Sequence, residues 1–96
     1  MEAMTPQERS QKAHELVARG AVLLDVRTPE EFQQGHPEAA RNIPVQVLAQ
    51  RLSEVGPAGT PVVVYCAAGG RSAVAAELLR KGGFPDVFDL GSVKNW

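Results

Sequence analysis

The stretch that decides the fold runs from Pro61 to Ser72 and reads PVVVYCAAGGRS. Its first part, Val62 to Tyr65, is a short β-branched and aromatic run, which is typical of a buried strand. After the stretch, apolar residues recur at helical spacing. These residues are Val74, Ala75, Leu78 and Leu79. Cys66 is therefore predicted at the carboxyl end of a strand, where a tight loop leads into the N-terminus of a helix.

This position favours an activated thiol. Helix N-termini carry unpaired N–H groups and a partial positive charge. The small residues that follow Cys66 allow the loop to curl so that several amides point at one anion. We therefore expect the pKa of Cys66 to lie below the value of about 8.5 for a free thiol.

Two segments upstream have the form of a helix start. Each reads Thr-Pro-x-Glu, at positions 5–8 and 28–31, so a Thr cap is followed by Pro in the first turn and Glu three residues later. We expect the first helix to end near Gly20 and the second to be short, because Pro37 follows it closely. Between them, residues 21–26 form an apolar run without alternation, which fits a strand buried on both faces, as in a parallel sheet.

The remaining segments continue this alternation of helices and strands. Phe32 is the expected core anchor of the short helix, and residues 36–42 are expected to be loop. Residues 45–55 carry apolar side chains at helical spacing. The helix after Cys66 is expected to end at Gly82-Gly83, before a short strand at 87–90. The order predicts an α/β fold with a mainly parallel sheet, in which ligands bind at the carboxyl ends of the strands.

Composition narrows the class of protein. The chain has 96 residues, which suits one domain, and its 44% hydrophobic content predicts a globular fold. Its net charge of -1 gives no reason to expect nucleic acid or an anionic membrane as partner. No apolar run approaches the ~20 residues needed to span a bilayer, and the polar N-terminus lacks a signal-peptide pattern, so a cytoplasmic location is expected. One cysteine excludes an intramolecular disulfide and a multi-cysteine metal site.

Three motifs occur in order along the chain. The parts of the first are Leu24-Asp25-Val26-Arg27, Glu31-Phe32, Gly35-His36 and Asn42-Ile43-Pro44. The second is Cys66-Ala67-Ala68-Gly69-Gly70-Arg71-Ser72, of the form C-x-x-G-x-R-S, and the third contains Gly91 and Trp96. Together these motifs resemble the signatures of the rhodanese family, the sulfurtransferases that carry sulfur as a cysteine persulfide.

Two positions depart from the family pattern. Ala39 and Ser92 each stand where the family has a glycine, and neither lies in the loop after Cys66. The changes therefore concern local geometry more than chemistry. Trp96, in the closing motif, is expected to plug the core at the chain end instead of contacting substrate.

The resemblance implies a fold and a reaction. The fold is a rhodanese-like three-layer domain over residues 1–96, with a roughly five-stranded, mainly parallel sheet flanked by helices. The reaction moves a sulfane sulfur from thiosulfate or a related donor to cyanide or a thiol through a Cys66 persulfide. The residues implied to bind substrate are Ala67, Ala68, Gly69, Gly70, Arg71 and Ser72. We also expect a monomer without cofactor or metal, and a sulfur-accepting protein is a further candidate partner.

Loop length separates this chemistry from a related one. Phosphatases on similar loops use C-x5-R, whereas four residues lie between Cys66 and Arg71 here. The shorter loop favours a sulfane sulfur over phosphate or arsenate. Two alternatives remain: a non-enzymatic persulfide carrier or interaction module, and, less favoured, a phosphatase or arsenate reductase.

The polar residues of the motifs have structural as well as functional interpretations. Arg71 either staples the loop by bonding carbonyls or contacts an anionic donor, and both roles are compatible. Asp25 and Arg27 are expected to be structural, with Asp25 bonding loop amides and Arg27 pairing with Glu31 at i,i+4. His36 is expected to form a loop hydrogen bond in preference to acting as a base.

Overall fold

A computed structural model of the chain describes residues 3–96. Met1 and Glu2, the start of the polar N-terminus considered above, lie outside the described residues. The elements, in chain order, are α1 (Pro6–Ala18), β1 (Val22–Asp25), α2 (Pro29–Gln33), β2 (Arg41–Asn42), α3 (Val45–Leu48), the 3-10 helix η1 (Leu52–Glu54), β3 (Val62–Cys66), α4 (Gly70–Lys81), β4 (Val87–Ser92) and the 3-10 helix η2 (Val93–Asn95).

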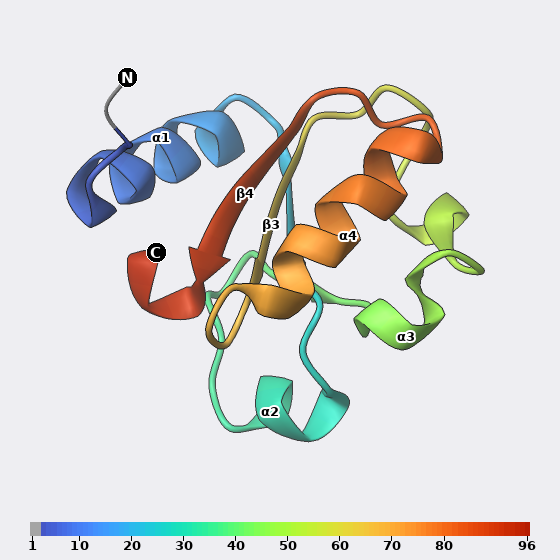
Figure 1. Cartoon of the computed structure of the whole chain (residues 1–96), viewed down its shortest axis with the longest axis horizontal. Coiled ribbons are helices and arrows are strands. Elements are labelled where there is room, and N and C mark those ends of the chain that lie inside the picture. The colour runs from blue at the N-terminus through green and yellow to red at the C-terminus, as the bar shows by residue number, and fades with distance from the viewer. Residues whose placement is uncertain (1–2) are drawn as a thin grey trace.

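The four strands form one parallel sheet in the order β2-β1-β3-β4 (Figure 1). This confirms the predicted α/β fold with a mainly parallel sheet, but the expectation of five strands is wrong for the described residues. Residues 6–18, ahead of β1, form a helix because they carry a capping box and an apolar stripe. The edge strand β2 lies inside the segment predicted to be loop. Asn42 holds it in place by donating from Nδ2 to the carbonyls of Asp25 at 3.0 Å and Arg27 at 2.9 Å.

Helices cover both faces of the sheet, and the alternation of β3 decides which face each side chain reaches. Figure 1 shows α1 on one side of the sheet and α3 and α4 on the other. Val62, Val64 and Cys66 belong to the core cluster under α3 and α4. Val63 and Tyr65 belong to the cluster under α1, because successive strand side chains point to opposite faces. The thiol of Cys66 therefore faces α4.

The capping boxes of α1 and α2 form as predicted, with Thr5 and Thr28 each accepting the backbone N–H three residues later. The predicted role of Phe32 is wrong, because it is only half-buried and stacks on His36 with ring centroids 3.6 Å apart. The reason is the place of α2 beyond the carboxyl ends of the strands (Figure 1), away from both core clusters.

Two further differences concern helices. The segment 45–55 is divided into α3 and η1 instead of forming one helix. Val74 is 56% exposed, because the buried face of α4 is formed by Ser72, Ala75, Ala76 and Leu79. The helix ends before Gly82-Gly83 as expected, and Gly83 adopts a φ of 104°, which favours glycine. No helix within residues 3–96 is long and apolar enough to cross a bilayer.

The chain end packs as the sequence predicts. Trp96 contacts the core cluster under α1 and is half-buried. Its ring stacks on His14 with centroids 3.6 Å apart, and its carbonyl accepts a 2.7 Å hydrogen bond from the Ser10 hydroxyl. These contacts join the last residue to α1.

Candidate functional site

Cys66 is the last residue of β3, and a loop of three residues separates it from the first residue of α4. The thiol is buried, and Sγ accepts a 2.9 Å hydrogen bond from the backbone N–H of Gly69. Gly69 aims its amide this way with a φ of 112°, in the left-handed region that favours glycine. The loop therefore curls its backbone donors around the sulfur, as the sequence predicts.

Burial and hydrogen bonding act on the thiol in opposite directions. Burial raises the pKa of Cys66, whereas the Ser72 hydroxyl and the backbone N–H groups of Ser72, Gly69 and Ala68 lower it. The hydrogen bonds prevail, so the pKa lies below its ordinary value. This is the direction expected from the loop and the helix N-terminus.

Ser72 sits fully buried beside the thiol. Its hydroxyl donates to the Gly69 carbonyl at 3.0 Å and lies 3.4 Å from the Gly91 carbonyl. A hydroxyl has one proton to donate, so a bond to the thiolate replaces the bond to Gly69. Ser72 thus exchanges a bond that holds the loop for one that stabilises the charged sulfur.

The far side of the loop is bound to β4 by Ser92, one of the two positions that depart from the family pattern. The hydroxyl of Ser92 donates to the carbonyl of Ala67 at 2.7 Å and accepts the Lys94 N–H at 3.1 Å. A glycine at this position would lack both bonds. The serine in place of the family's glycine was the only feature of the sequence that pointed to these bonds.

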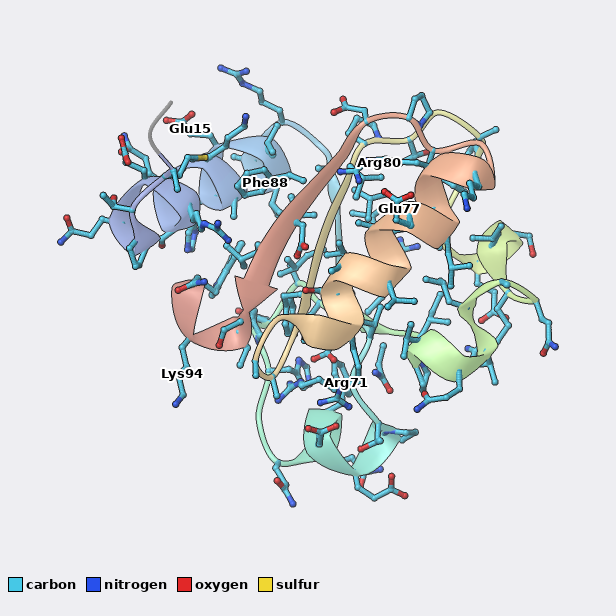
Figure 2. The ribbon with its side chains drawn as sticks, in the orientation of Figure 1. Glu15, Arg71, Glu77, Arg80, Phe88 and Lys94 are labelled. Atoms are coloured by element: carbon cyan, nitrogen blue, oxygen red, sulfur yellow. The ribbon has the colours of Figure 1, made fainter. Side chains whose placement is uncertain are left out.

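Arg71 does not bond loop carbonyls, so that interpretation is wrong. Its guanidinium forms a two-pronged ion pair with Glu31 of α2, Nη1 to Oε1 at 2.7 Å and Nη2 to Oε2 at 3.0 Å. Figure 2 shows Arg71 at the beginning of α4, directed toward α2. The pair joins the loop to a helix that lies 40 residues earlier in the chain.

The predicted pairing of Arg27 with Glu31 is also wrong. Thr28 is the extended cap of α2, so residues 27 and 31 do not lie one turn apart on a helix. Arg27 instead donates Nε and Nη2 to the carboxylate of Asp25 at 2.7–3.1 Å, and Nη2 reaches the Gly35 carbonyl at 2.8 Å. The guanidinium therefore ties the end of β1 to the chain beyond α2.

Asp25 is completely buried and accepts hydrogen bonds from Arg27, just beyond β1, and from Tyr65 of β3. Within residues 3–96 its carboxylate accepts one backbone N–H, that of Arg27 at 2.9 Å, so the expected bonding to loop amides is confirmed for a single amide. The hydroxyl of Tyr65 donates to the Asp25 carboxylate at 2.6 Å. Burial, and to a lesser degree this hydrogen bond, raises the pKa of Tyr65. Asp25 and Tyr65 are register partners in β1 and β3, so the network braces the strand end that carries Cys66.

The remaining residues of the loop lie between the end of β3 and the first turn of α4. Gly69, Ser72 and the amide of Ala68 act on the thiol directly, and Ala68 and Gly70 are exposed. His36 lies outside this loop, and its Nδ1 is 2.8 Å from the Pro37 carbonyl, which confirms the loop hydrogen bond. Residues 3–96 contain no group of three or more His, Cys, Asp or Glu side chains arranged to hold a metal.

Comparison with known proteins places this arrangement in a family. Residues 9–96 match the rhodanese-like domain. The chain belongs to the rhodanese-like family. It is 46% identical over 79 residues to the uncharacterized protein YqhL of Bacillus subtilis, covering 81% of this chain and 62% of that protein. The chain thus spans a little under two thirds of this relative.

Relatives with named activities are also similar. The thiosulfate sulfurtransferase PspE of Escherichia coli is 38% identical over 73 residues, covering 75% of this chain and 70% of PspE. The solved structure titled rhodanese with anions from E. coli superimposes with a TM-score of 0.75 at 36% identity, over 80% of this chain and 92% of that one. The human single-domain sulfurtransferase TSTD1 gives a TM-score of 0.75 at 26% identity, over 90% and 87% of the two chains.

Proposed function

We propose that this chain is a sulfurtransferase that carries a sulfane sulfur on Cys66. The observation that carries the proposal is the cradle around the thiol, in which backbone N–H groups and the Ser72 hydroxyl stabilise a charged sulfur. The same donors suit the terminal sulfur of a persulfide anion, which extends from Cys66 into the curl of the loop. Relatives named as thiosulfate sulfurtransferases support this assignment.

The reaction balances without a general base. The Cys66 thiolate attacks the outer sulfur of thiosulfate, the bond between the two donor sulfurs breaks, and sulfite leaves with the electron pair. The persulfide anion keeps the single negative charge of the thiolate. Cyanide or a thiolate then attacks the terminal sulfur, and the Cys66 thiolate returns as leaving group. His36, which is bonded to its own loop, has no proton to move in this sequence of steps.

The substrate-binding role belongs to the loop residues Ala67, Ala68, Gly69, Gly70, Arg71 and Ser72. Their backbone provides the donors, and the uncharged side chains leave the approach to sulfur unobstructed. The small radius of a loop with four intervening residues suits one sulfur atom more than a tetrahedral phosphoryl group. A small-molecule donor, a thiol or cyanide acceptor and a protein acceptor all fit this surface chemistry.

The test is production of thiocyanate from thiosulfate and cyanide by the wild type and by Cys66→Ser. A serine hydroxyl cannot form a persulfide, so we expect turnover to fall to background while circular dichroism stays unchanged. Turnover that persists in this variant would overturn the proposal. A persulfide that forms without turnover to any small acceptor would instead favour the carrier interpretation.

A further inference from the structure

Two arginines interact electrostatically with each other, and each is bound by its own carboxylate. Arg27 is paired with Asp25, and Arg71 is paired with Glu31. Arg71 lies two residues after Gly69, whose N–H donates to Sγ of Cys66 at 2.9 Å, so it belongs to the turn that holds the thiol. The hydrogen bond to Glu31 and, to a lesser degree, the charge of Cys66 raise the pKa of Arg71. The residues between Cys66 and Arg71 carry no charged side chain. A donor that approaches the sulfur therefore meets a guanidinium whose charge is already balanced.

The two ion pairs differ in exposure. Asp25 is fully buried, and moving it would leave a buried guanidinium without a counter-charge, which is costly. The side chains of Arg71 and Glu31 are 34% and 32% exposed, so water and ligands reach both. Of the two carboxylates, Glu31 is therefore the one that an incoming sulfur donor can reach and interact with.

Glu31 is held toward Arg71 by its own helix. Its Oε1 accepts the backbone N–H of Thr28 at 3.0 Å and the Thr28 hydroxyl at 3.2 Å, in the capping box of α2. The bond to Arg71 and that to Thr28 lower the pKa of Glu31 to about 2, so the carboxylate is ionised at neutral pH. The negative charge beside Arg71 is thus fixed in place before any substrate arrives.

We propose that Glu31 is a specificity-determining residue that acts through Arg71 and disfavours dianionic sulfur donors relative to donors of lower charge. The inference rests on the sulfurtransferase function proposed above. A dianionic donor that binds Arg71 must compete with the Glu31 carboxylate, which already accepts hydrogen bonds from Nη1 and Nη2 of Arg71. Because Coulomb energy scales with the charge of the ligand, the carboxylate penalises a dianion twice as much as a monoanion.

The variants that test this are Glu31→Gln and Glu30→Gln. Glutamine retains the capping box, since either Glu or Gln serves at this position, but it removes the charge. Glu30 is exposed in the same first turn and bonds neither Thr28 nor Arg71, so its substitution removes the same charge from the same helix.

The first measurement does not depend on sulfur transfer. Cys66 is alkylated with iodoacetate, an anion, and with iodoacetamide, which is neutral, and the ratio of the two rates cancels changes in thiolate fraction. We expect Glu31→Gln to raise this ratio about threefold at low ionic strength, because the variant loses the negative charge paired with Arg71, and added salt to reduce the effect. Glu30→Gln should leave the ratio near the wild-type value. An unchanged ratio in Glu31→Gln would overturn the inference.

The second measurement compares two donors with the same sulfane chemistry. Thiosulfate is a dianion and methanethiosulfonate is a monoanion, and each releases its outer sulfur to a thiolate. We expect Glu31→Gln to raise kcat/KM for thiosulfate relative to methanethiosulfonate about threefold. An equal fall in kcat/KM for both donors would show that Glu31 only holds the loop. That result would overturn the donor preference but not the proposed function. Absence of turnover with both donors in the wild type would overturn the proposed function and the donor preference with it.

Discussion

Replacing Asp25 with Asn removes the negative charge that accepts hydrogen bonds from the side chains of Arg27 and Tyr65 at the ends of β1 and β3. Arg27 donates both Nε and Nη2 to this carboxylate, and Tyr65 donates its hydroxyl at 2.6 Å. Asp25 is 0% exposed, so water cannot replace the lost acceptor. The asparagine amide also turns one acceptor into a donor that faces other donors.

The magnitude follows from the burial of the pair. Removing one partner of a buried ion pair costs about 3–5 kcal/mol, because the remaining charge is left uncompensated. A chain of this length has a free energy of unfolding of roughly 5–14 kcal/mol. Each 1 kcal/mol moves Tm by about 4–8 °C in a domain of this size, so we expect Tm to fall by at least about 12 °C.

The assay is urea unfolding followed by circular dichroism, with two reference variants. Tyr65→Phe removes one hydrogen bond to the carboxylate without stranding a donor, so we expect a smaller loss of about 1.5–3 kcal/mol. Glu54→Gln breaks the exposed pair with Arg51 and should leave stability near that of the wild type. If Asp25→Asn lost less stability than Tyr65→Phe, the buried carboxylate would not stabilise the strand ends as we propose.

Three other predictions concern the loop and its partners. Ser92→Ala removes the hydroxyl bonded to the Ala67 carbonyl, so we expect a loss of about 1 kcal/mol in urea unfolding and a lower kcat; an unaltered kcat would show that the loop does not need β4. The rate of alkylation of Cys66 by iodoacetamide should rise with pH with a midpoint below about 8.5, because the loop donors lower its pKa, and a midpoint at or above that value would contradict the cradle. The pKa of Glu31 is lowered from 4.5 to about 2, so its pairing with Arg71 stabilises the fold above pH 4.5 and is lost as the pH falls toward 2. The stability difference between the wild type and Glu31→Gln should therefore shrink over that range, and a constant difference would refute the linkage.

The features that the sequence predicted are those encoded by neighbouring residues. The two Thr-Pro-x-Glu segments begin helices because the cap and its partner lie within one turn. The position of Cys66 was predictable because a β-branched run, small residues and a helical pattern follow one another without interruption. The parallel sheet followed from the same alternation of apolar runs and helices.

The features that were missed depend on which distant residues the fold brings together. Glu31 was assigned to Arg27, four residues away, whereas its partner Arg71 lies 40 residues away on another element. Tyr65 was taken as part of an apolar run, although its hydroxyl bonds Asp25 across the sheet. Aligning the ends of the two apolar runs would have placed Asp25 beside Tyr65, as the register does, but no local pattern identifies the pair of Glu31 and Arg71.

The most direct test of the account is the mass of the protein after treatment with thiosulfate. We predict that the peptide containing Cys66 gains the mass of one sulfur atom, that cyanide removes it, and that Cys66→Ser gains nothing. An unmodified Cys66 in protein that still converts thiosulfate and cyanide to thiocyanate would contradict the persulfide on which the account depends.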